Sequence, residues 1–311
     1  MSRRDSAVTF QPHRPRALRV LPMCVGAALL CSALTSCNRD TMTKAEMKST
    51  SAVTRGESTK QQLEPDWKSL ATMPIYFGHQ SVGRNLVDGL REMTDSSSSI
   101  PLRIVHSRER APDRANTLVE FLIGENGRAE SKLTDFAAAL EQIGDTGDAV
   151  ALFKYCYLDI TAATDVEALF ARHRDAVRTM RVKHPNLTFI HVTAPLTTLE
   201  TGPRYVVKRL LGKSTTRDAN ARRNEFNARI RNAYRDEPIF DLAQVESTRP
   251  DGSRSFFRIG ADTVHTLAPE LTDDGGHLNA TGRRAAATEF AAVVARAVTA
   301  RRMATRTPSA D

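Results

Sequence analysis

Two segments far apart in the sequence carry side chains that could carry out nucleophilic chemistry together. Ser81 lies in residues 78–83 (GHQSVG), directly after a short apolar run. Asp274 and His277 lie in residues 274–279 (DGGHLN), close to the C-terminus. A serine, a histidine that takes its proton and a carboxylate that orients the histidine form a nucleophilic triad. The residue types therefore predict such a triad if the fold brings the two segments together.

The spacing within the second segment suits this interpretation. The carboxylate of Asp274 can fold back onto the ring of His277 through a turn, which Gly275 and Gly276 permit. Asp273 is a rival partner for the imidazole. An interpretation without catalysis also stays open, in which the serine only caps a helix and the aspartate only closes an Asx turn.

The elements that would position these residues alternate between strand and helix patterns. Residues 106–129 are predicted to form a polar loop. The segments between the predicted strands have apolar residues at helical spacing, as in right-handed crossovers. We therefore expect a flavodoxin-like, three-layer α/β/α sandwich with a five-stranded parallel sheet. Ser81 would then lie at the carboxyl end of the first strand, where ligands bind in such sheets. The predicted strands are residues 74–77, 102–105, 149–153, 187–192 and 239–240.

In this order and on these elements, the two segments resemble those of the SGNH (GDSL-like) hydrolase superfamily, over about residues 70–300. The resemblance implies ester hydrolysis or acyl transfer without a metal or organic cofactor. It also implies that Ser81 is the nucleophile, His277 the base and Asp274 its partner. No spacing of histidine, cysteine and carboxylate residues suggests a zinc site, and no glycine-rich nucleotide-binding string follows any predicted strand.

The sequence departs from the family pattern at two places. The usual Gly-Asp-Ser is replaced by residues 78–81 (GHQS), and the block after the third predicted strand, residues 154–159 (KYCYLD), contains no asparagine. An oxyanion needs two or three hydrogen-bond donors, of which the backbone N–H of Ser81 is one. The further candidates for contacting the oxyanion or the substrate are His79, Gly124, Asn126, Gly127, Lys154 and Tyr155.

The N-terminal 36 residues have the layout of an export signal. Three arginines precede an apolar stretch at residues 20–34, which is too short for a membrane-spanning helix. Residues 34–37 (LTSC) resemble the lipobox of bacterial lipoproteins, which implies that an acylated Cys37 anchors the protein to a lipid bilayer. By resemblance to Gram-negative sorting rules, Asn38 implies the outer membrane, facing the periplasm. An ordinary cleaved signal with a chance cysteine is the alternative.

Composition divides the rest of the chain into three parts. Residues 37–66 are polar and are expected to be a flexible tether, residues 67–300 to form one domain, and residues 301–311 to be a disordered tail. Cys156 is the only cysteine in the predicted domain, where a buried thiol is its commoner state. Asp241, after the last predicted strand, is a candidate clamp between loops.

The charge of the chain does not indicate nucleic acid as a partner, but it leaves anionic polymers and lipids open. The formal net charge of +8 falls to 8 − 4 = +4 without residues 1–36, which carry five arginines and one aspartate. This mild excess does not call for nucleic acid. The densest basic stretch, residues 208–235, is either a solvated helix face or a contact for anionic envelope polymer or lipid headgroups.

These observations predict a serine esterase anchored in the cell envelope. Its expected substrates are acetyl or other short-acyl esters, with an acylated carbohydrate as one candidate. Two alternatives stay open. One is an acyltransferase that uses the same triad on an envelope glycan, and the other is a catalytically silent, glycan-binding lipoprotein.

Overall fold

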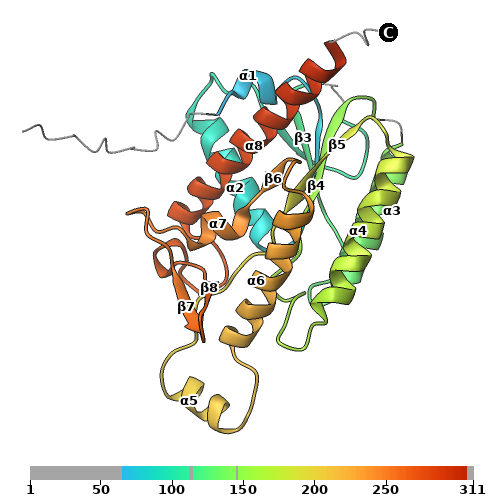
Figure 1. The fold of residues 1–311 in the computed structure, drawn as a ribbon. Helices are drawn as coiled ribbons and strands as arrows, with labels where there is room; N and C mark the ends of the chain where they lie inside the picture. Colours follow the sequence, from blue (N-terminus) through green and yellow to red (C-terminus); the bar gives the residue numbers. More distant parts are fainter. Residues whose placement is uncertain (1–64, 112–114, 145, 307–311) are drawn as a thin grey trace, which may run out of the picture. The chain divides into compact units, whose positions relative to one another are not determined.

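Six parallel strands form the main sheet of the computed structural model, in the order β2-β3-β1-β4-β5-β6 (Figure 1). The structure describes residues 65–111, 115–144 and 146–306. The chain builds one side of β1 first and then crosses to the other side, so the order reverses at β1. Ligands bind at such reversals in open sheets. The strands are β1 Ile75–His79, β2 Arg103–His106, β3 Thr117–Leu122, β4 Ala149–Phe153, β5 Leu187–Val192 and β6 Ile239–Phe240.

Helices cover both faces of this sheet (Figure 1). Alternate residues of a strand enter opposite cores, so Val150 and Leu152 of β4 join one apolar cluster while Ala151 and Phe153 join the other. The predicted three-layer α/β/α sandwich is confirmed. One face carries α1 Trp67–Leu70, α2 Val82–Ser96, α7 Leu242–Ser247 and α8 Ala280–Arg306, and the other carries α3 Ala129–Ile143, α4 Val166–Lys183 and α6 Thr216–Ala233.

Three smaller elements lie outside these layers. Helix α5, Pro203–Leu210, lies between β5 and α6 in the sequence. Strands β7, Phe256–Ile259, and β8, Asp262–His265, form a separate antiparallel hairpin. A single 3₁₀ turn, Pro269–Leu271, precedes the segment that contains Asp274 and His277.

The predicted number of strands was wrong, because β3 lies inside the predicted polar loop. Glu120 interrupts its apolar pattern, yet the side chain of Glu120 is wholly buried. Its carboxylate is bonded by His79 Nε2 at 2.9 Å, Arg91 at 3.0 Å and His106 Nδ1 at 3.0 Å. A buried charge is tolerated when it is paired in this way. Strand β3 therefore pairs directly with β1 and places the 123–127 loop beside the Ser81 turn.

The predicted end of the domain also needs correction. Helix α8 continues to Arg306, so residues 301–306 are helical and not part of a tail. Arg301 pairs with Asp148 at 2.8 Å, which ties this end of the helix to the start of β4. Residues 307–311, the predicted signal, Cys37 and nearly all of the tether lie outside the described residues. No helix within the described ranges is both long and apolar enough to cross a membrane.

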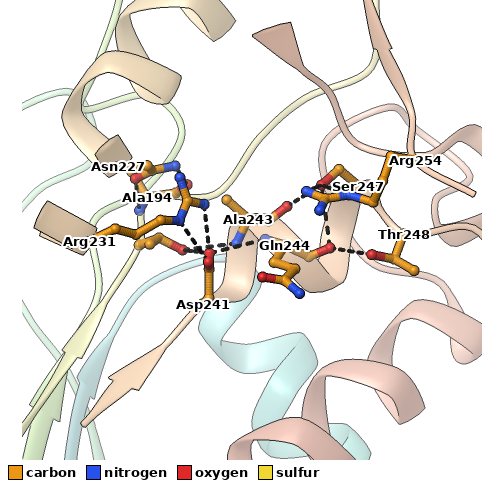
Figure 2. A network of polar contacts seen from close by, with 10 residues as sticks. Ala194, Asn227, Arg231, Asp241, Ala243, Gln244, Ser247, Thr248 and Arg254 are labelled. Carbon is orange, nitrogen blue, oxygen red and sulfur yellow. Dashed lines mark hydrogen bonds and ion pairs between the residues drawn. The ribbon is translucent and has the colours of Figure 1, made fainter. Parts of the chain in front are cut away.

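Asp241 clamps three elements together, as predicted. It accepts hydrogen bonds from Arg231 of α6 at 2.7 and 2.8 Å (Figure 2). It also accepts from the hydroxyl of Thr193, which follows β5, at 3.0 Å. It also caps α7 through the amide of Gln244 at 3.1 Å. These bonds fix the carboxyl ends of β5 and β6, which lie at the same edge of the parallel sheet as Ser81.

Candidate active site

Ser81 lies at the carboxyl end of β1 with a strained backbone. Its φ is 48° and its ψ is −109°, in the left-handed region that non-glycine residues seldom adopt. Such a conformation costs on the order of 1–3 kcal/mol and persists only where the surroundings enforce it. The residue occupies the N-cap position of α2, but its hydroxyl makes no capping hydrogen bond. Instead Ser81 Oγ lies 2.6 Å from His277 Nε2.

The other ring nitrogen of His277 meets Asp274. The distance from Nδ1 to Asp274 Oδ2 is 2.6 Å. The backbone amide of His277, its ring and the backbone amide of Gly276 donate to Asp274, and together they hold the pKa of this carboxyl well below its usual range. Because an ionised carboxylate only accepts hydrogen bonds, Nδ1 carries the proton and Nε2 accepts from the Ser81 hydroxyl.

The rival carboxylate points elsewhere. Asp273 Oδ1 lies 3.4 Å from the side-chain amide of Asn279. No contact between Asp273 and the imidazole is present among the described residues. The structure therefore brings together Ser81, His277 and Asp274, the three residues predicted from the sequence.

Two neighbouring elements hold the histidine turn in place. Asn85 of α2 accepts from the amide of Leu278 at 3.1 Å, and the amide of Thr198 donates to the carbonyl of Gly275 at 2.9 Å. Gly275 has a φ of 85°, which a side chain would strain. Gly83 is needed for a different reason, because a Cβ there would lie 2.3 Å from that of His79. The start of α2 can thus approach β1 closely enough to present Ser81.

The site is open to solvent, and the backbone amide of Ser81 is free to donate there. The side chains of His277 and Asp274 are 41% and 57% exposed, so water reaches the base. Within the described residues the Ser81 amide donates to no protein acceptor. This amide lies at the positive end of α2, where an oxyanion is stabilised.

Two of the three candidate donors in the loop after β3, the amides of Gly124 and Gly127, are already engaged, which corrects the prediction for these two. The amide of Gly124 donates to Asp135 at 2.8 Å, and that of Gly127 donates to Asp159 at 2.7 Å. Neither amide is free for an oxyanion in this structure. The side-chain oxygen of Asn126 accepts from Lys132 Nζ at 3.2 Å, and the residue otherwise faces solvent. The carboxylates of Asp135 and Asp159 therefore accept the hydrogen bonds that these two amides could have donated to an oxyanion.

The remaining three candidates are buried and do not line the site. His79 is bonded to Glu120, and burial lowers its pKa although the carboxylate opposes this. Lys154 donates to the carbonyl of Tyr155 at 2.9 Å, and burial lowers its pKa to about 8. The Tyr155 hydroxyl lies 3.2 Å from His173 Nδ1. The side chains of Lys154 and Tyr155 are fully buried, and Tyr155 packs in the same apolar cluster as Phe153.

The sequence analysis missed Tyr157. Its ring packs edge-on against that of His277, with centroids 5.7 Å apart and planes at 73°. The Tyr157 carbonyl accepts from Arg223 Nε at 3.1 Å, which holds the loop after β4 in position. Burial, followed by the nearby Cys156 and Asp274, raises the Tyr157 pKa, so its phenol keeps a proton to donate. Tyr157 lies within the block that lacks an asparagine, and the hydroxyl donor of its phenol is the signal in the sequence that could have identified it.

Two further features concern the cysteine of the domain and possible metal ligands. Cys156 is a free, buried thiol, as expected. In the part of the chain that the structure describes, no three histidine, cysteine or carboxylate side chains converge so as to hold a metal ion.

Comparison with known proteins gives remote structural likenesses. No protein-family model and no curated protein matches the sequence. A GDSL-like lipase from Bacteroides thetaiotaomicron matches at 14% identity over 76% of this chain and 91% of that chain, with a TM-score of 0.45. An acetyl xylan esterase matches at 14% identity over 70% and 98%, with a TM-score of 0.41. The C-terminal catalytic domain of Streptococcus pneumoniae peptidoglycan O-acetyltransferase A matches at 14% identity over 75% and 96%, with a TM-score of 0.37. At this level of similarity, none of these proteins decides the chemistry of this chain.

Proposed function

We propose that this chain is a serine hydrolase of the SGNH (GDSL-like) kind that cleaves ester bonds. One observation carries the proposal. The hydroxyl of Ser81 occupies a helix N-cap, where it would ordinarily bond the helix backbone, yet it is turned to His277 at 2.6 Å. A serine that serves only as a cap has no reason to adopt this orientation, whereas a nucleophile needs a base within hydrogen-bonding reach.

The proposed reaction follows from this geometry. Ser81 Oγ attacks the carbonyl carbon of the ester while its proton passes to His277 Nε2. The carbonyl oxygen gains the negative charge, and the free Ser81 amide donates to it. His277 then gives the proton to the departing alcohol as the C–O bond breaks, which leaves an acyl-serine. A water molecule attacks the acyl carbon and returns its proton through His277, so the acid and free Ser81 are released.

Asp274 has two tasks in this scheme. It fixes the tautomer of His277 by accepting from Nδ1, and it stabilises the imidazolium that forms when Ser81 gives up its proton. Its low pKa keeps it ionised throughout the ordinary working range of pH.

Solvent exposure supports water as the acyl acceptor. A transferase protects its acyl-enzyme by excluding water, but His277 and Asp274 are 41% and 57% exposed here. We therefore propose hydrolysis and not transfer. The contacts from Ser81 to His277 and from His277 to Asp274 also argue against a silent binding domain, because binding alone needs no base on the serine hydroxyl.

The substrate and the location are proposed from the sequence. Acetyl or other short-acyl esters, including those on carbohydrate, are the substrates we propose. Residues 34–37 (LTSC) support export and an acylated Cys37 at the outer membrane, facing the periplasm.

Release of acetate from aryl acetates and acetylated oligosaccharides, without an added acceptor, tests this function. We expect wild type to release acetate, Ser81→Ala to release none above background, and Ser98→Ala, a control at an exposed serine beyond α2, to match wild type. Equal activity of Ser81→Ala and wild type would disprove the proposal, as would no turnover of any short-acyl ester by wild type. Acyl transfer to an added glycan in place of release would favour the transferase.

A further inference from the structure

Helix α5 turns its apolar side away from the protein. Val206 is 52% exposed, Val207 53%, Leu210 81% and the following Leu211 64%. These four residues account for four of the ten large apolar side chains that are exposed in the described part of the chain. A helix on the surface of a globular protein normally presents the opposite pattern, with its apolar stripe facing the core.

Two polar residues of α5 are less exposed than its apolar residues. Tyr205 and Lys208 are only half-exposed, and Lys208 Nζ donates to the carboxylate of Glu200. Helical spacing places Val206, Val207 and Leu210 on one side and Tyr205 and Lys208 on the other. Lys208 is thus held by the loop that leads into α5, and the opposite side of the helix presents a contiguous apolar surface without a partner in the described chain.

Cations flank this apolar surface. Residues 199–217 carry five lysines or arginines and a single acid, Glu200. Arg209 and Lys213 are exposed, and neither makes an ion pair with a described residue. A helix with an exposed apolar side and adjacent unpaired cations has the composition of helices that lie in the interface of anionic membranes.

The position of α5 relates it to the candidate active site. Figure 1 shows α5 as an outlying helix, joined by loops to β5 and α6. The segment that leads into it passes the histidine turn, where Thr198 bonds the carbonyl of Gly275 at 2.9 Å. Only four residues separate Thr198 from Pro203, the first residue of α5. A surface bound by α5 is thus held at the edge of the sheet that carries Ser81.

We propose that α5 docks on the surface of an anionic lipid bilayer. Val206, Val207, Leu210 and Leu211 enter the acyl-chain boundary, while Arg209 and Lys213 meet phosphate headgroups. An anionic glycan would satisfy the cations but leave the apolar side in water. A second copy paired through α5 would bring two cationic segments together, and like charges repel. A bilayer provides both an apolar layer and anions. The proposal is independent of the ester chemistry of Ser81.

A local reporter tests the proposal in the full chain. Trp67 is the only tryptophan, so Trp67→Phe gives a background in which Leu210→Trp reports on α5 alone. Val182→Trp is the matched control, because Val182 is 78% exposed on α4. Each variant is mixed with vesicles of phosphatidylcholine and phosphatidylglycerol, with and without brominated acyl chains. Because quenching is local, attachment of the chain through its N-terminus does not produce it at residue 210.

We expect the emission of Leu210→Trp to shift to the blue on these vesicles and to be quenched by brominated chains, with Val182→Trp unchanged. Adding Arg209→Glu and Lys213→Glu should lower the lipid affinity measured by this quenching at least tenfold, because each cation contributes about a factor of five. Val207→Trp serves as a second reporter if Leu210→Trp fails to fold.

Three results would overturn the proposal. The first is no quenching at either α5 reporter in a folded protein. The second is a blue shift without lipid that grows with protein concentration, which indicates a second copy. The third is a shift on an anionic polysaccharide but not on vesicles, which indicates a polymer site.

Discussion

Replacing Asp274 with asparagine isolates the contribution of its charge. Asparagine keeps the shape of the side chain and an oxygen that can accept from the amides of Gly276 and His277. It loses the negative charge and places a neutral amide near His277 Nδ1, where the carboxylate oxygen now lies at 2.6 Å. The variant should therefore fold as wild type does but lose the stabilisation of the imidazolium that forms during catalysis.

The exposure of the pair sets the size of the effect. Two opposite charges about 4 Å apart attract by about 1 kcal/mol in water and by about 4 kcal/mol near a protein surface. Asp274 is 57% exposed and His277 41%, so solvent screens their attraction and a value of about 2–3 kcal/mol is reasonable. That corresponds to a fall in kcat of about 30- to 160-fold. The same exchange in a buried triad costs about 10⁴-fold.

Steady-state hydrolysis of an aryl acetate measures this effect, and unfolding in urea checks that the variant is folded. Asp273→Asn is the matched control, since Asp273 contacts Asn279 and should leave kcat unchanged. A fall of less than threefold for Asp274→Asn would show that Asp274 is not the partner of His277. A fall of about 10⁴-fold would refute the reasoning that solvent screens this pair.

Three further predictions concern the surroundings of the site. Tyr157→Phe should lower kcat about 100-fold in the same assay with little change in KM, if its phenol donates to the oxyanion; an unchanged kcat would exclude that role. Burial acts to raise the pKa of Glu120, but hydrogen bonds from His79 and His106 outweigh it and lower this pKa from 4.5 to about 2. Ionised Glu120 should therefore add about 3 kcal/mol to the free energy of unfolding above pH 4.5, and this should be lost as the pH falls through 2. Unfolding in urea at a series of pH values should show the loss in wild type but not in Glu120→Gln. Burial raises the pKa of Glu246 to about 8, so wild type should lose stability as the pH rises from 4.5 through 8, while Glu246→Gln should match wild type at pH 6. A loss of about 3–5 kcal/mol by that variant at pH 6 would instead indicate an ionised buried pair.

The layers of the fold could be predicted because they follow from local patterns. An uninterrupted apolar run identified β4, since strands buried on both faces have this pattern. Strand β5 was identified from a largely apolar run that Thr188 and His191 interrupt. Strand β3 could not be found by that rule, because Glu120 breaks its run. Only the partners of Glu120, which come from β1, α2 and β2, make this strand possible, and no sequence pattern connects them.

The three residues Ser81, His277 and Asp274 were predictable for a similar reason. Two glycines separate Asp274 from His277, so a turn can join them, and Ser81 follows a parallel strand whose carboxyl end lies at the edge where ligands bind. The further donors were not predictable in this way. Whether the Gly124 amide is free depends on Asp135 of α3, and this tertiary contact leaves no mark in the loop itself.

Labelling with a fluorophosphonate, followed by mass spectrometry of the adduct, tests the central claim most directly. The probe reacts readily with a serine whose proton a neighbouring base removes, and slowly with an unactivated serine. We predict one adduct, on Ser81, that is formed by wild type and is lost in His277→Ala. A folded wild-type protein that forms no adduct at Ser81, or labelling that persists without His277, would contradict an activated serine at this site.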